Sequence, residues 1–169
     1  GRGGIRPLEF KTFSKEMQNA ITNYCQAGGN FFVSGAYVAS DLWDNRLVKA
    51  NEEDKKFAME VLKYKWRVGQ AARNGKVKSV TSPFPEITGS YTYYQDLNPE
   101  SYVVESPDAL EPAAQGAFTI LRYSENNLSA GIAYKGNYKT CVLGFPFEAI
   151  RTVTERELLM KAILTFFKH

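Results

Sequence analysis

The chain has 169 residues, of which 44% are hydrophobic and 23% charged, with a formal net charge of +3. This length and composition predict one folded domain with a sizeable core and exclude a globally disordered chain. The charge is too mild to indicate a nucleic-acid partner. No apolar run approaches the roughly 20 residues of a transmembrane helix.

Histidine and cysteine are scarce, which excludes several kinds of catalytic site. The one histidine, His169, is the last residue, and the two cysteines, Cys25 and Cys141, are far apart in the sequence. A Ser-His-Asp or Cys-His triad needs an imidazole held beside the nucleophile, and zinc sites need several His or Cys ligands. We therefore expect neither a triad nor such a metal site, so that any chemistry would have to rest on carboxylates, Lys, Tyr or a cofactor. No cofactor is predicted. Two buried thiols are expected, with one disulfide as the alternative.

The N-terminal part predicts a helix followed by a buried strand. Residues 1–12, rich in Gly and Arg, are expected to be loose, and residues 13–169 to form a single domain. Ser14 is a plausible N-cap, and Gly28-Gly29 ends the helix. Between them, apolar residues fall at helical spacing at Met17, Ala20, Ile21, Tyr24 and Cys25. Residues 30–34 then predict the strand.

The stretch from Ser34 to Asp41 predicts a sharp turn into a second helix over residues 37–45. In open α/β sheets, ligands bind where the carboxyl end of a strand meets the next helix. Free backbone N–H groups at that helix start would favour an anion or a polar ligand. Alternatively, Ser or Asp side chains satisfy these N–H groups. If the chain has a site, we expect it at this turn.

The middle of the chain contains an amphipathic helix and a basic segment. Asn51 predicts the helix start, with Asp54 at the capping-box position. Residues 63–78 are basic around Trp66 and could contact phosphate or RNA, but a solvated connector is favoured. Within that segment, Asn74-Gly75 predicts a tight turn between short extended pieces.

The remaining elements predict a mixed sheet closed by a helix. Residues 83–112, rich in Pro and Tyr, predict a long ordered loop with a strand near residues 87–94, and its aromatic rings could stack on sugars or pack the loop. Thr154, with Glu157 three residues later, predicts the start of the last helix. Three strands, joined by hairpin turns, are expected before it, at residues 117–123, 129–134 and 138–143.

Two segments together resemble class I glutamine amidotransferases. The helix, Gly pair, strand and small-residue turn Ser34-Gly35-Ala36-Tyr37 resemble the region that presents the nucleophilic cysteine of that family. Residues 144–150, Gly-Phe-Pro-Phe-Glu-Ala-Ile, resemble its Gly-x-Gln-Phe-His-Pro-Glu segment, which supplies the triad His and Glu. More closely, both segments resemble the amidotransferase-like module of secreted bacterial multidomain proteins often described as xanthan lyases.

This resemblance implies an α/β fold, a flavodoxin-like, class I glutamine amidotransferase-like three-layer sandwich whose mixed sheet has antiparallel hairpins towards the C-terminus. It also implies that the triad is absent. Ala36 or Tyr37 occupies the position of the nucleophile, Glu148 that of the His and Ile150 that of the Glu. The short stretch before the first helix indicates a piece of a longer protein. An extracytoplasmic location (periplasmic, cell-surface or secreted) follows from the resemblance alone.

Two functions of different classes are compatible with these residues. The first is a non-catalytic scaffold or binding domain of a secreted bacterial protein, with carbohydrate or neighbouring domains as partners. The alternative is a glycan-active enzyme in which Glu148 and Asp41 act as a carboxylate pair roughly 5–9.5 Å apart. A nucleotide or flavin binder is disfavoured because the turn lacks a Gly-rich phosphate loop. The candidate pocket consists of Ser34, Gly35, Ala36, Tyr37, Asp41 and Glu148.

Overall fold

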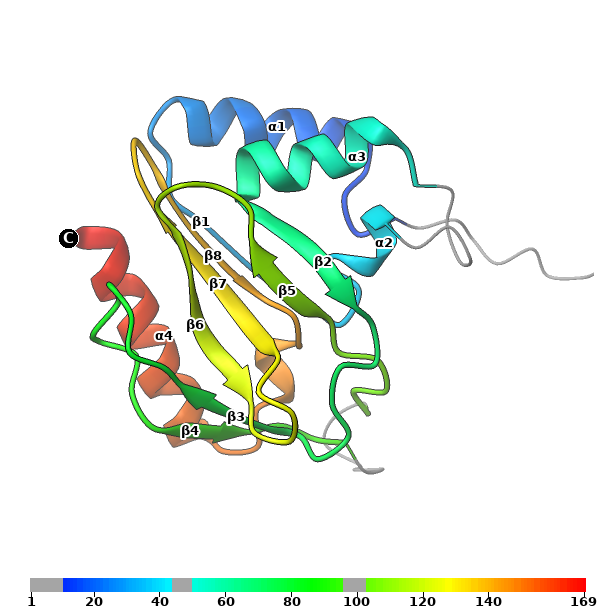
Figure 1. The fold of residues 1–169 in the computed structure, drawn as a ribbon. Coiled ribbons are helices and arrows are strands. Elements are labelled where there is room, and N and C mark those ends of the chain that lie inside the picture. Colours follow the sequence, from blue (N-terminus) through cyan, green and yellow to red (C-terminus); the bar gives the residue numbers. More distant parts are fainter. Residues whose placement is uncertain (1–10, 44–49, 96–102) are drawn as a thin grey trace, which may run out of the picture.

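The computed structural model describes residues 11–43, 50–95 and 103–169, and it confirms the mixed α/β class (Figure 1). Helices and strands are interleaved along the whole chain. In order, they are α1 (Lys15–Gln26), β1 (Phe31–Ser34), α2 (Ser40–Trp43), α3 (Glu52–Phe57), the π-helix η1 (Ala58–Leu62), β2 (Tyr64–Val68), β3 (Lys76–Ser79), β4 (Ser90–Thr92), β5 (Ala109–Pro112), β6 (Ala117–Tyr123), β7 (Ser129–Lys135), β8 (Lys139–Leu143), the 3₁₀ helix η2 (Phe147–Ala149) and α4 (Val153–Lys168).

A six-stranded sheet in the order β1-β8-β7-β6-β3-β4 forms the centre, and β2 and β5 form a separate two-stranded sheet. The β1–β8 pair is parallel, and the other neighbours in the large sheet are antiparallel. The predicted mixed sheet with antiparallel hairpins towards the C-terminus is thus confirmed. The flavodoxin-like three-layer sandwich is not confirmed, because such folds have mostly parallel sheets and one pair among the described strands is parallel.

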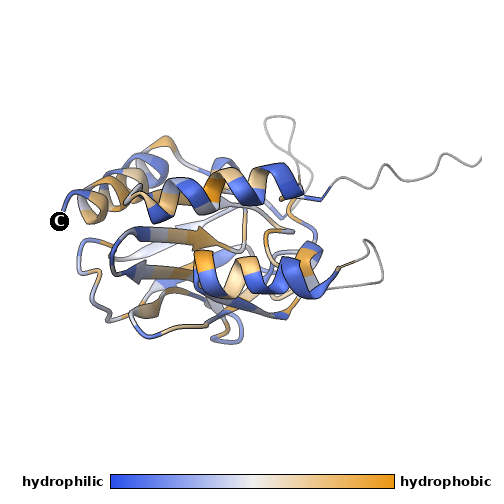
Figure 2. Ribbon diagram, turned by 90° about the horizontal axis from the view of Figure 1, so that it is seen from above, coloured by the Kyte–Doolittle hydropathy of each residue, from blue (hydrophilic) through white to orange (hydrophobic). Residues whose placement is uncertain are grey.

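Two apolar clusters lie on opposite faces of the large sheet. Ile132 of β7 and Val142 of β8 pack towards α1, α3, η1 and the two-stranded sheet. Their strand neighbours Ala133 and Cys141 pack towards α4 and the segment that carries β4. Successive side chains of a strand point to opposite faces, so β7 and β8 are buried on both sides. Figure 2 shows hydrophilic and hydrophobic residues alternating along the surface helices, as expected of helices with one buried face.

The helix starts predicted at Ser14 and Asn51 are confirmed. The Ser14 hydroxyl accepts a hydrogen bond from the Met17 amide at 3.3 Å, and Gly28 follows the end of α1 with φ of 90°. Glycine adopts this left-handed conformation without a Cβ clash. At α3, the Asn51 and Asp54 side chains bond each other's backbone N–H groups and form the predicted capping box.

Three predictions along the chain need correction. The last helix begins two residues earlier than expected, because Thr152 and not Thr154 accepts the N-cap bond, from Glu155. The predicted loop at 83–112 contains a second strand, β5, besides β4. The helix expected over residues 37–45 is the short α2 after a turn, and the end of that range lies outside the described residues.

Candidate functional site

The turn after β1 and the segment after β8 lie next to each other. Ser34 pairs in register with Leu143, and the Gly35 amide donates to the Leu143 carbonyl at 3.2 Å. The Phe147 amide donates to the Ser34 hydroxyl at 3.0 Å. Adjacent parallel strands end at the same edge of a sheet, which is why both segments reach one place.

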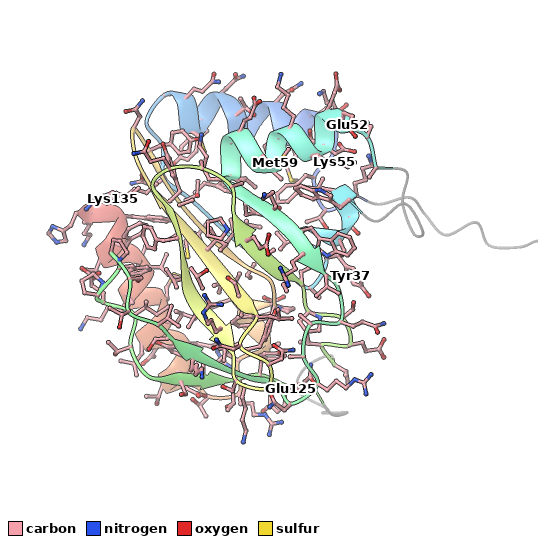
Figure 3. All side chains as sticks on the ribbon, viewed as in Figure 1. Tyr37, Glu52, Lys55, Met59, Glu125 and Lys135 are labelled. Atoms are coloured by element: carbon pink, nitrogen blue, oxygen red, sulfur yellow. The ribbon has the colours of Figure 1, made fainter. Side chains whose placement is uncertain are left out.

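The predicted pocket residues have different surroundings at this place. The Ser34 hydroxyl is engaged by Phe147, and Ala36 packs against the core on the α4 side. Tyr37 is 42% exposed and lies at the surface on the α2 side of the molecule (Figure 3), and Glu148 is exposed on η2. The pocket that would unite all six residues stays a prediction.

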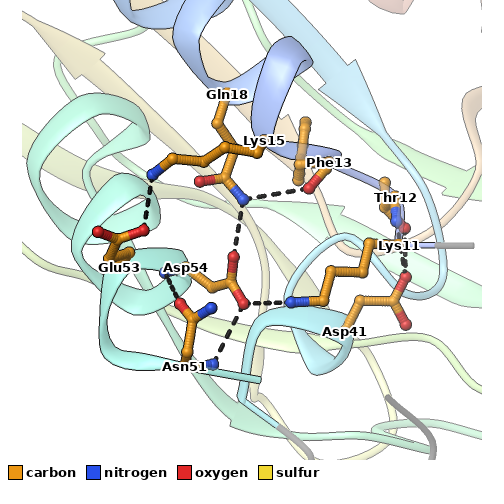
Figure 4. Close-up of polar contacts among 9 residues, drawn as sticks. All are labelled: Lys11, Thr12, Phe13, Lys15, Gln18, Asp41, Asn51, Glu53 and Asp54. Carbon is orange, nitrogen blue, oxygen red and sulfur yellow. Dashed lines mark hydrogen bonds and ion pairs between the residues drawn. The ribbon is translucent and has the colours of Figure 1, made fainter. Parts of the chain in front are cut away.

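Asp41 turns towards the N-terminal segment. It is 8% exposed, and its Oδ2 accepts hydrogen bonds from the Thr12 amide at 3.0 Å and the Thr12 hydroxyl at 2.6 Å (Figure 4). A carboxylate that works as a glycosidase acid or nucleophile must face the substrate. The contacts of Asp41 are those of a structural anchor, which gives no support to a catalytic pair with Glu148.

The same N-terminal segment is tied to the start of α3. Lys11 Nζ lies 2.5 Å from Asp54 Oδ2, and Gln18 Nε2 donates to Asp54 Oδ1 at 2.8 Å. Burial raises the pKa of Asp54, but the Lys11, Gln18 and Asn51 bonds more than offset this and leave it below its usual range. Residues 1–10 of the segment expected to be loose lie outside the described residues, whereas Lys11 and Thr12 at its end bond the helical layer.

Asp108, a residue that the sequence did not single out, closes the start of α2. Its Oδ2 accepts from the amides of Ala39 at 2.9 Å and Ser40 at 2.8 Å. Its Oδ1 accepts from the indole N–H of Trp66 at 3.2 Å. The alternative in which an Asp side chain satisfies these N–H groups is therefore the one that the structure shows. The protein's own carboxyl group takes the place that an anionic ligand would need.

The environment of Asp108 is dry and crowded. The residue is fully buried, and its backbone N–H donates to the Gly144 carbonyl at 2.7 Å while the Tyr123 hydroxyl donates to its carbonyl at 2.7 Å. A Cβ on Gly144 would lie 2.0 Å from the Asp108 carbonyl oxygen. Burial raises the pKa of Asp108 to about 7, although hydrogen bonds from Ser40, Ala39 and Trp66 oppose the increase. Asp108 thus connects α2, β5 and the end of β8.

The thiols and the metal-binding residue types offer no further chemistry in the described part of the chain. Cys25 and Cys141 are free and buried, and burial raises the pKa of Cys25 to about 11. Neither thiol has thiolate character at neutral pH. Among the described residues, no three His, Cys, Asp or Glu side chains are grouped to hold a metal ion. None of the described helices has the length and hydropathy to cross a bilayer.

Comparison with known proteins identifies a structural neighbour and corrects the resemblance. No family model and no curated protein matches the sequence. The exo-beta-1,4-mannosidase Op5Man5 from Opitutaceae bacterium strain TAV5 matches the fold with a TM-score of 0.50 and 10% sequence identity. The match covers 91% of this chain but 23% of that chain.

The assignment to class I glutamine amidotransferases and xanthan lyase modules is therefore wrong, since a mannosidase matches the fold and no family model supports the assignment. At 10% identity the likeness to the mannosidase shows the fold alone.

Proposed function

We propose that this chain is a non-catalytic, glycan-associated domain of a longer extracytoplasmic protein. The observation that carries the non-catalytic part is the closure of the turn by Asp108. Its carboxyl group takes two N–H groups at the start of α2, and the neighbouring Ala36 has no nucleophilic atom. A turn filled in this way positions elements of the fold, and these two N–H groups are no longer available to a substrate.

The glycan part rests on the structural neighbour, which acts on a β-1,4-linked mannoside by its name. The present chain spans 23% of that protein, so the proposed role is that of an accessory domain beside a separate glycan-acting part. A location outside the cytoplasm agrees with a polysaccharide partner. A relation to flavodoxin-like sandwiches stays a prediction and does not bear on this role.

Calorimetry with neutral and acidic oligosaccharides, together with a hydrolysis assay on the same panel, tests the proposal. We expect heat of binding for at least one glycan and no release of reducing ends. The matched control is the variant Glu148→Gln, shown by circular dichroism to keep its fold, which should behave like the wild type in the hydrolysis assay. Turnover by the wild type that disappears in this variant would establish the enzyme and overturn the proposal.

A further inference from the structure

The two-stranded sheet passes over the large sheet (Figure 1). A cavity of about 460 Å³ is lined by residues of both sheets. β5 packs against β7 and β6, and the cavity opens beside it towards the turn between β6 and β7. Leu110, which is fully buried, contributes an apolar wall together with Pro112 and Leu128. A volume of this size fits one or two sugar rings. We call this cavity the basic groove, because Arg67 of β2 and Arg122 of β6 both line it.

A break in the β6–β7 ladder aims Arg122 into the basic groove. Thr119 and Arg122 are three residues apart, so a regular strand would point them to opposite faces. The pairing register shifts on both sides of Leu121, and both Thr119 and Arg122 line the groove. β-bulges are typical of places where a side chain is redirected for function.

Arg67 is placed by a second bulge, in β2. In the β2–β5 pair, Trp66 lies opposite Leu110 and Val68 opposite Ala109, so Arg67 is the extra residue. Its guanidinium bonds the Glu111 carboxylate at 2.5 Å within the groove wall. Two independent irregularities of the backbone therefore deliver the two guanidinium groups to one cavity.

The positive charges around the groove favour an anionic ligand, and their mutual repulsion does not stabilise the folded protein. Arg122 lies directly opposite Lys78 in the β3–β6 pair, and like charges at such positions repel each other. Arg122 donates to the Asn127 carbonyl at 2.8 Å, which leaves most of its five N–H groups for a ligand. Glu111, the acidic residue that lines the groove, is already paired with Arg67. A guanidinium matches a carboxylate in a two-bond geometry.

Hydroxyl groups complete the lining. The Thr119 hydroxyl donates to the hydroxyl of Ser129, a buried residue, at 3.2 Å. Paired hydroxyls beside an apolar wall suit the hydroxyl edge and the C–H face of a pyranose ring. None of the described residues that line the groove is aromatic, so the groove lacks the base-stacking platform that single-stranded nucleic acids use.

We propose that the basic groove binds a carboxylate-bearing sugar, a uronic acid unit of an acidic polysaccharide, through Arg122 and Arg67. The inference rests on the proposed glycan-associated function and specifies its ligand. The carboxylate lies between the two guanidinium groups, and the ring lies against Pro112 and Leu128. Long-range attraction by Lys78 adds to binding and weakens with salt.

The test is a titration of the ¹⁵N-labelled protein with trigalacturonic acid, followed by NMR and calorimetry. We expect amide shifts at residues 110–112 and 119–129, and affinity that falls as NaCl is raised. Arg122→Gln should weaken binding about tenfold, since one charge-assisted contact is lost. Arg122→Lys keeps the positive charge but loses the planar guanidinium, so its affinity should lie between those of the wild type and Arg122→Gln. Lys161→Gln removes a charge from exposed α4, on the other face of the sheet, and should leave affinity unchanged.

Circular dichroism confirms that each variant is folded before its affinity is compared. Mannotriose binding without trigalacturonate binding would overturn the inference and leave the proposed function standing. If trigalacturonate instead shifts amides at the turn after β1, and Arg122→Gln does not affect these shifts, the groove is not the binding site. The proposed glycan-associated function would still stand. Tighter binding of a single-stranded RNA oligomer that depends on Arg122 would replace the sugar by a nucleic acid. If no glycan in the panel produced amide shifts or heat of binding, both the groove proposal and the proposed glycan-associated function would be overturned.

Discussion

Replacing Asp108 with Asn tests whether this buried carboxyl group makes the stability of the protein depend on pH. Burial raises the pKa of Asp108 to about 7 in the folded state, whereas an unfolded chain titrates it near 3.8. Between these values the folded protein holds a proton that the unfolded chain has lost. The free energy of unfolding therefore decreases as pH rises through 7. At about 1.4 kcal/mol per pH unit, and with the folded group half ionised at pH 7, the interval from pH 5 to pH 7 gives a loss of about 2 kcal/mol.

Urea unfolding followed by circular dichroism between pH 5 and pH 8.5 measures this effect. The Asp108→Asn variant has no such proton, so its stability should change less over the interval. Its amide oxygen keeps the bonds from Ala39 and Ser40, but its amide N–H₂ faces the Trp66 indole, which costs about 1–3 kcal/mol. The two curves should thus be furthest apart at pH 5 and converge towards pH 8. Equal pH slopes for the wild type and the variant would refute the reasoning.

Three further changes have expected outcomes. Gly144→Ala should lower the urea midpoint by the equivalent of about 1–3 kcal/mol or more, because its Cβ would meet the Asp108 carbonyl at 2.0 Å; an unchanged midpoint would contradict that contact. Asp54→Asn should cost about 1–3 kcal/mol at pH 7. The pKa of Asp54 is lowered, so its contribution is present above pH 3.8 and lost as pH falls through the folded value. The acid limbs of the two unfolding curves should therefore converge. Ellman's reagent at pH 8 should modify Cys25 and Cys141 only after denaturation, and rapid labelling of the native protein would show that they are accessible.

Local signals in the sequence predicted local structure well. Ser14 and Asn51 cap helices through bonds that span three residues, and such caps depend on little beyond the neighbouring chain. The three strands before the last helix pair in hairpins of short loops, so their register follows from alternation and turn residues. The start of the last helix was predicted two residues too late, because both Thr152 and Thr154 offer a hydroxyl near an acidic residue.

The candidate site was harder to predict from the sequence, because its decisive contacts join residues that are far apart in the chain. Asp108 caps α2 by accepting from the amide of Ser40, 68 positions away in the chain. No spacing rule in the sequence marks a cap that comes from so distant a segment. β5 is four residues long, ends in Pro112 and pairs with a strand more than 40 residues earlier, so it lacked the alternation that identifies a strand. Arg67 and Arg122 looked like surface charges, since the bulges that aim them into one cavity are invisible in the sequence.

Strand β1 stands at one end of the strand order, and its position has a consequence for association of the isolated chain. Half of the backbone groups of such a strand point away from its partner β8. Phe31, Phe32 and Val33 are only half-buried, and neither a charge nor a proline interrupts them. In the isolated chain, this exposed edge of β1 would favour strand pairing between molecules and, at high concentration, fibrous aggregates. A lysine at Val33 would discourage such stacking, and light scattering would reveal the difference.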